Sequence, residues 1–130
     1  MAFEVPSFLP GVFSANLDLS DAQYLPVKPV AASGANVSAP AIGKISSSGE
    51  PMLGIIQNGP ALAEAATIMV AGISKAVVRG TGLVVGAKLM AVATGLGVCT
   101  SGSYQVATLL EDASDGDVAS VLIQQNGRAA

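Results

Sequence analysis

The chain of 130 residues contains no histidine and no tryptophan, and it has a single cysteine, Cys99. Histidine is the usual general base at neutral pH and the commonest transition-metal ligand, so most catalytic triads and zinc sites cannot be built from this chain. A lone cysteine cannot form an intrachain disulfide, which makes a reducing compartment the default expectation. We therefore expect a protein that is not an enzyme and that holds no metal and no cofactor.

Charged residues are also scarce, at 12% of the chain with a net charge of −3. Such a chain lacks the basic surface that binds phosphates, which argues against DNA or RNA as a direct partner. A membrane span needs about 20 mostly apolar residues. The window 65–74 is bounded by Glu64 and Lys75, and the uncharged stretch 89–110 is interrupted by Thr94 and several glycines. We expect no membrane span, and no secretory signal because no basic region precedes an apolar run at the start.

What the chain does contain is small and apolar side chains, with 22 alanines, 15 glycines, 15 valines and 13 serines. Apolar residues make up 51% of the sequence. A length below about 150 residues predicts one domain. Because a small monomer cannot hide so much apolar surface alone, we expect part of it to be buried against other subunits.

From residue 23 onward the chain is a series of short apolar runs separated by glycine, proline, serine or asparagine, which is the pattern of an all-β domain. The spacing of roughly eight to twelve residues favours a barrel or sandwich. Strands are expected over 23–30, 52–57, 66–71, 73–79, 87–93, 104–111 and 118–124. A helix from Pro60 to Val78 is the competing possibility, and it is best supported over 60–66, where Pro60 precedes good helix formers. Beyond Thr67, β-branched residues and Gly72 favour a strand.

The first residues have a different composition, since all three phenylalanines lie among them. Two prolines four apart forbid a regular helix, and aromatics spaced by five residues match neither helix nor strand. We interpret residues 1–22 as an extended N-terminal arm, 23–126 as a β-barrel domain and 127–130 as a short tail. The arm either packs on its own barrel or docks onto a partner. The candidates for contact with a partner are Phe3, Val5, Phe8, Leu9 and Phe13.

Few residues suggest chemistry. The one concentration of carboxylates is Glu111, Asp112, Asp115 and Asp117. Calcium takes oxygen ligands from loops of this kind, but the spacing does not match an EF-hand, and a solvated turn explains the acids without a metal. A small hydrolase using these acids is a minor possibility. The glycines at 80–82 lack the lysine of a phosphate-binding loop, so they are expected to form a turn. Cys99 is expected to be a small buried apolar residue.

Several segments together form a wider pattern. They are Gly54-Ile55-Ile56-Gln57-Asn58-Gly59-Pro60, Gly72-Ile73-Ser74-Lys75, Val85-Gly86-Ala87-Lys88-Leu89 and a closing strand from Asp117 to Ile123. In this order, the pattern from 23 to 124 resembles the small capsid decoration, or cement, proteins of tailed bacteriophages. The chain departs from that family in the phenylalanine-bearing arm before Asp21 and in the glycine-punctuated region 95–103.

The resemblance implies a mainly β fold, as a small β-barrel or β-tulip-like domain. It further implies a homotrimer made in the host cytoplasm and placed on the outer surface of an icosahedral phage head. There it would clamp neighbouring major capsid subunits and stabilise the shell against packaged DNA. The alternative is an exposed virion module that binds a host-surface glycan or protein. If the arm reaches a neighbouring subunit, removing residues 1–20 should leave a folded oligomer that no longer binds expanded heads.

Overall fold

A computed structural model describes residues 7–128, with side chains from residue 13 onward. Every regular element in this range is a strand, so the expectation of a mainly β fold is confirmed. The alternative helix over 60–66 is instead a turn that leads into a strand. The strands are β1 Ser7–Ala15, β2 Pro26–Val30, β3 Ala41–Lys44, β4 Gly54–Ile56, β5 Ala65–Arg79, β6 Lys88–Val92, β7 Gly95–Val98, β8 Tyr104–Leu109 and β9 Val118–Arg128.

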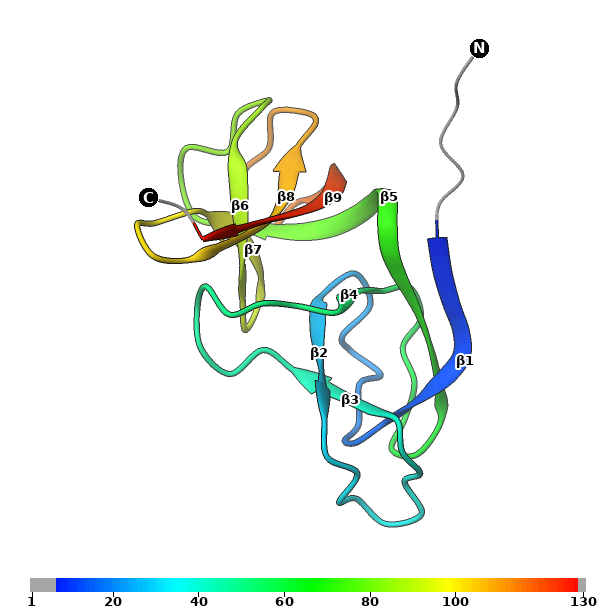
Figure 1. The fold of residues 1–130 in the computed structure, drawn as a ribbon. Helices are drawn as coiled ribbons and strands as arrows, with labels where there is room; N and C mark the ends of the chain where they lie inside the picture. The colour runs from blue at the N-terminus through cyan, green and yellow to red at the C-terminus, as the bar shows by residue number, and fades with distance from the viewer. Residues whose placement is uncertain (1–6, 129–130) are drawn as a thin grey trace.

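The strand pairings close two five-stranded rings that share β5. In the first ring, which we call the N-terminal barrel, β5 pairs with β1 and β4, β1 pairs with β3, and β2 joins β3 to β4. In the second ring, the C-terminal barrel, β5 pairs with β7 and β9, and β6 and β8 complete the circuit. Figure 1 shows β5 rising along the N-terminal barrel and then turning across into the C-terminal one. The prediction of a small β-barrel is therefore confirmed.

The change of partners along β5 takes place at one point. Ala71 is opposite Ser7 of β1, whereas the next residue, Gly72, is opposite Ile123 of β9. Strands β9 and β1 thus follow one another along the same edge of β5. Gly72 has a φ of 96°, a left-handed conformation that costs glycine little and other residues more. This glycine lets one strand turn from the first barrel into the second.

Each barrel has its own hydrophobic core, and neighbouring residues of the shared wall point into different ones. Ile68 belongs to the core of the N-terminal barrel, while Met69 belongs to the core of the C-terminal barrel. Ile56 and Ile55 of β4 divide between the two cores in the same way. Because successive side chains of a strand point to opposite faces, the outer face of the N-terminal barrel at β4 and β5 packs onto the C-terminal barrel.

The start of the described chain belongs to a barrel. Strand β1 pairs with β5 from Ser7↔Ala71 to Ser14↔Ala65, and its last two residues also pair with β3. After β1, Ala15 and Leu19 are fully buried in the N-terminal core. The expected boundary between an arm and a barrel at residues 22 and 23 is therefore not seen, since the barrel already includes Ser7. Pro10 has no N–H group to donate, so it fits best where one edge of a strand is unpaired. On the edge of β1 that faces away from β5, no described strand pairs with the stretch around Pro10.

An ion pair braces the loop between β3 and β4. Lys28 Nζ donates to Glu50 Oε1 at 2.9 Å and to Ser46 Oγ at 2.6 Å. Glu50 Oε2 accepts the backbone N–H groups of Ser46 and Ser47 at 2.8 and 2.9 Å. The Lys28 hydrogen bond, followed by the backbone bond from Ser47, lowers the pKa of Glu50 from 4.5 to about 2. A carboxyl group whose pKa is lowered by folding stabilises the fold above its unfolded pKa and loses that contribution as the pH falls toward the folded value.

Substitution Glu50→Gln should therefore lower the free energy of unfolding by about 1 kcal/mol at neutral pH, because the amide cannot pair with Lys28. The difference from the parent protein should shrink as the pH falls below 4.5 and vanish near 2. Denaturant unfolding at several pH values measures this difference in the free energy of unfolding. In a double-mutant cycle with Lys28→Met, the double variant should lose less free energy of unfolding than the sum of the losses in the two single variants. Additive losses, or a difference independent of pH, would contradict this role for the pair.

Candidate functional site

The exposed large hydrophobic side chains gather on the C-terminal barrel. Of the seven found among residues 13–128, five lie on this barrel, and the other two, Leu17 and Leu62, lie on the N-terminal barrel. Val84 and Val85 are the most exposed, at 57% and 63%. Contiguous exposed apolar surface on a small protein marks an interaction site more often than scattered single residues do. We call the following set the apolar surface: Ile73, Val84, Val85, Leu110 and Val118.

Backbone hydrogen bonds bring the β5–β6 loop against the end of β8. The Val85 N–H donates to Asp112 Oδ1 at 2.9 Å, and the Gly86 N–H donates to the Leu109 carbonyl oxygen at 2.7 Å. The Leu110 N–H in turn donates to the Ser120 carbonyl oxygen of β9 at 3.0 Å. These bonds place Val84 and Val85 beside Leu110, and Leu110 beside β9. The loop is therefore held by both a side chain and the backbone, so its two valines are presented on a fixed support.

The remaining members of the apolar surface lie on the outer face of β5 and β9. Val118 is opposite Val77, and Ile73 is opposite Leu122, with Lys75 between these two pairs along β5. The inward positions that alternate with them are buried, which fixes the outward direction of the exposed set. Ile73 is 53% exposed and Val118 is 50% exposed. This sheet face is thus apolar at two rows and carries one cation in the middle.

A shallow groove of about 510 Å³ lies on the other side of the same β5–β6 loop. Its floor is Gly97 of β7, which is opposite Met90 of β6 and beside Arg79 of β5. Since Leu89 and Ala91 point into the barrel, Met90 and Val92 point outward and form one wall. The groove exists because the outward position of β7 carries no side chain. Its lining is Arg79, Gly80, Thr81, Met90, Val92, Gly97, Val98, Cys99 and Thr100.

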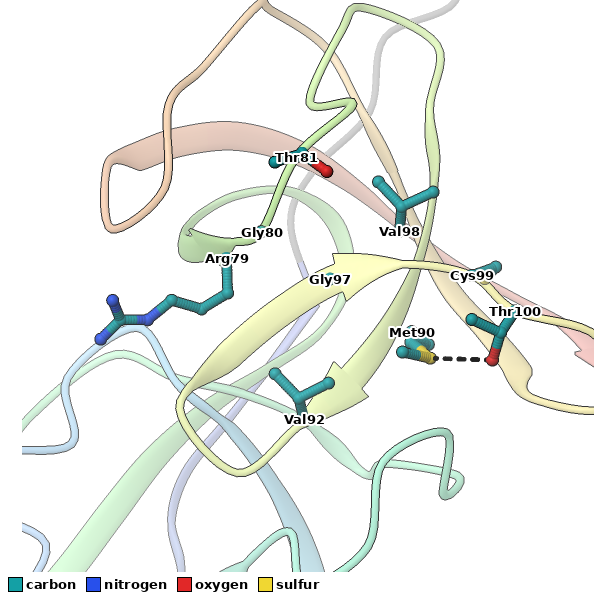
Figure 2. Close-up of a pocket in the computed structure, with 9 residues that line it drawn as sticks. All are labelled: Arg79, Gly80, Thr81, Met90, Val92, Gly97, Val98, Cys99 and Thr100. Carbon is teal, nitrogen blue, oxygen red and sulfur yellow. Dashed lines mark hydrogen bonds between the residues drawn. The ribbon is translucent and has the colours of Figure 1, made fainter.

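The groove offers contacts rather than reactive groups. Figure 2 shows the Arg79 side chain turned away from Met90 and Thr100, whose hydroxyl lies 3.8 Å from the Met90 sulfur. Arg79 Nε donates to the Thr94 carbonyl oxygen at 3.3 Å, and Arg79 Nη1 is 3.9 Å from Asp115 Oδ2. Burial raises the pKa of the Cys99 thiol, which keeps it protonated and weakly nucleophilic at neutral pH. Cys99 is half-buried at the groove, so the expectation of a buried residue holds only in part.

The four acids of the 111–117 segment each accept a backbone hydrogen bond at a separate place. Besides the bond from Val85 to Asp112, Asp115 Oδ1 accepts the Gly80 N–H at 2.8 Å. Asp117 Oδ2 accepts the Ser114 N–H at 2.9 Å, and Glu111 Oε1 accepts the Ser120 N–H at 3.3 Å. Carboxylates that cap backbone N–H groups in this way are ordinary turn chemistry. Across residues 7–128, no group of three or more histidine, cysteine or acidic side chains is arranged to hold a metal ion.

The residues predicted for partner contact are placed as follows. Phe3 and Val5 lie outside the described residues. The backbones of Phe8 and Leu9 are in β1, opposite Met69 and Ile68. Phe13 is half-buried and packs against the core of the N-terminal barrel. The role of these five residues as partner contacts therefore stays a prediction.

Sequence reasoning did not single out the apolar surface. Its one local signal is the adjacent pair Val84 and Val85, two large apolar side chains in a glycine-bounded loop. The part of the chain described here contains no helix long and apolar enough to pass through a membrane. Comparisons with protein-family models, with curated proteins and with solved structures give no match.

Proposed function

We propose that this chain is a capsid decoration protein of a tailed bacteriophage, which docks on the outer surface of the expanded head and clamps neighbouring major capsid subunits. The observation that carries the proposal is the gathering of five of the seven exposed large hydrophobics on one barrel. A protein that only binds needs apolar, well-supported surface and little else. The sequence resemblance to cement proteins supplies the kind of partner.

The composition of the surface supports a protein partner. Net charge is −3, and Lys75 is the one cation between the two apolar rows of the β5–β9 face, so phosphate-rich nucleic acid and anionic membranes find little complementary charge there. In this proposal the chain forms a homotrimer, so that several modest contacts with the shell act together through effective concentration. The residues predicted as capsid contacts keep that role within this proposal, namely Phe3, Val5, Phe8, Leu9 and Phe13.

Replacing both loop valines tests the docking surface. The variant Val84→Asp/Val85→Asp should bind undecorated expanded heads of the encoding phage at least about tenfold more weakly, because two charges would have to be desolvated at the contact. Both side chains are exposed, so the melting temperature should change little. Co-sedimentation of the protein with heads measures the affinity.

The matched control is Leu62→Asp, which places a charge on an exposed apolar residue of the other barrel, 42% exposed in the parent. It should bind heads as the parent does. Parent-like binding by the folded valine variant would refute the docking surface. Failure of the parent protein to bind heads, together with binding to a glycan array, would refute the capsid role and favour the alternative of a host-recognition module.

A further inference from the structure

The chain contains two asparagine–glycine sequences, Asn58-Gly59 and Asn126-Gly127. Asparagine is among the chemically labile residues of proteins. Its side-chain amide is open to attack by the backbone nitrogen of the next residue, and glycine in that position exposes this nitrogen because it has no side chain. The reaction requires the asparagine side chain to turn toward the following nitrogen. The two sites differ in how freely that can happen.

Asn126 lies in an irregular part of β9, beyond the point where β9 leaves β5. Ile123 is opposite Ala107, and Gly127 is opposite Gln105, so residues 124–126 of β9 face the single residue Val106 of β8. This is a bulge, in which the extra residues are left without a cross-strand partner. Asn126 is exposed, and Gly127 adopts a φ of 79° with open space around its Cα. Both the side chain and the following peptide unit are accessible.

Asn58 is held in place at both ends of its amide. Its Oδ1 accepts the Thr67 N–H at 3.0 Å, and its Nδ2 donates to the Ala65 carbonyl oxygen at 3.1 Å. These two bonds tie the turn after β4 to the start of β5. The side chain is half-buried, and a Cβ added at Gly59 would lie only 2.6 Å from the Ser20 carbonyl oxygen. Turning the Asn58 amide toward the Gly59 nitrogen would break both hydrogen bonds.

We propose that Asn126 is a site of spontaneous deamidation in the folded protein and that the fold protects Asn58. The Gly127 nitrogen loses its proton and bonds to Cγ of Asn126, the Cγ–Nδ2 bond breaks, and ammonia leaves. The resulting five-membered cyclic imide is opened by water at one of its two carbonyl carbons. The products are aspartate or isoaspartate at position 126, and no oxidation or reduction takes place.

The modification changes the charge at the end of β9. One carboxylate replaces a neutral amide, so the formal net charge goes from −3 to −4. The new charge stands two residues before Arg128, whose guanidinium lies 5.1 Å from the centre of the Tyr104 ring. In the isoaspartate product the backbone also gains a methylene group within the β8–β9 ladder. The modified protein is therefore separable from the parent by charge and distinguishable by its peptide map.

Incubation of the folded full-length protein at mildly alkaline pH, followed by peptide mapping with mass spectrometry, tests the proposal. Position 126 should be converted at least about tenfold faster than position 58, because Asn58 reacts only after local opening of its turn. In denaturant, both sites should react at similar rates. The variant Gly127→Ala should slow conversion at 126 in the folded protein and leave position 58 unchanged.

Equal rates at the two sites in the folded protein would overturn the protection of Asn58. Conversion at neither site in the folded protein, with conversion of both in denaturant, would overturn the assignment of Asn126. Ion-exchange separation of the charge variants gives a second readout that does not depend on peptide recovery. Neither measurement depends on whether the chain binds capsids.

Discussion

Removal of residues 1–20 is expected to unfold the N-terminal barrel instead of leaving a folded body. The deletion takes away β1, which closes that barrel by joining β5 to β3. It also removes Ala15 and Leu19, both with 0% exposure in the core. Loss of one fully buried leucine side chain alone costs about 2–5 kcal/mol. A small domain has a total stability of about 5–15 kcal/mol, so the combined loss should leave little folded protein.

Circular dichroism during thermal unfolding measures this outcome. The truncated chain should lack a cooperative transition, whereas deletion of residues 1–6, which ends before β1, should keep the transition of the parent protein within a few degrees. The short deletion also separates the two roles considered for the N-terminal region, because it removes Phe3 and Val5 and leaves β1 in the chain. A cooperative, parent-like transition in the chain lacking residues 1–20 would mean that β1 is dispensable for the fold.

The substitution Gly54→Ala is expected to destabilise the protein by about 3 kcal/mol. Gly54 begins β4, where the backbone lies very close to β5. A Cβ atom at this position would collide with the Met69 carbonyl oxygen and would lie 2.8 Å from Cγ2 of Ile68. The first of these obstacles is backbone, which cannot move aside without disturbing the ladder between the two strands. Relief would require β4 to move away from the strand that both barrels share.

Gly97→Ala is the matched control, since Gly97 is also a buried strand glycine. A Cβ added at Gly97 would lie 3.6 Å from the Arg79 carbonyl oxygen and 3.7 Å from Val92 Cγ1, which are ordinary van der Waals contacts. Because glycine weakens a strand relative to alanine by roughly 0.5–1 kcal/mol, this variant should be as stable as the parent or slightly more so. Denaturant unfolding of both variants gives the comparison. If Gly54→Ala and Gly97→Ala were equally stable, the close approach of β5 to Gly54 would not be the reason that glycine is required there.

Sequence reasoning placed six of the nine strands, and β1, β3 and β7 were not among them. Strands β2, β4, β6, β8 and β9 fall within or overlap the predicted ranges, and the runs predicted over 66–71 and 73–79 are the two halves of β5. Strand β7, with the sequence Gly-Leu-Gly-Val, was interpreted as a loop. Gly95 is needed there because an added Cβ would collide with the Val77 carbonyl oxygen. Close approach between two strands is a property of the fold, and no local pattern reveals it.

The candidate site was less accessible from the sequence than the fold. The acidic segment 111–117 stood out as a cluster in the sequence, but each acid accepts a hydrogen bond from a different backbone N–H group. In contrast, Ile73 and Val118 look like ordinary strand residues and become notable only because register places them on an outward face. A shift of one residue in that register would bury them. Exposure of an apolar side chain in a sheet is decided by pairing between distant segments, which the sequence alone did not specify.

Because both barrels contain β5, the fold also determines how this protein would respond to a mechanical force that pulls the barrels apart. Two domains joined by a flexible linker can separate like a hinge, with the connection yielding before either domain does. Here the passage from one barrel to the other is the covalent backbone of a continuous strand, held on one edge by β4 and β7 and on the other by β1 and β9. Tension applied across the molecule would therefore be resisted by several hydrogen-bonded ladders at once, as the proposed role of clamping a shell under internal pressure would require.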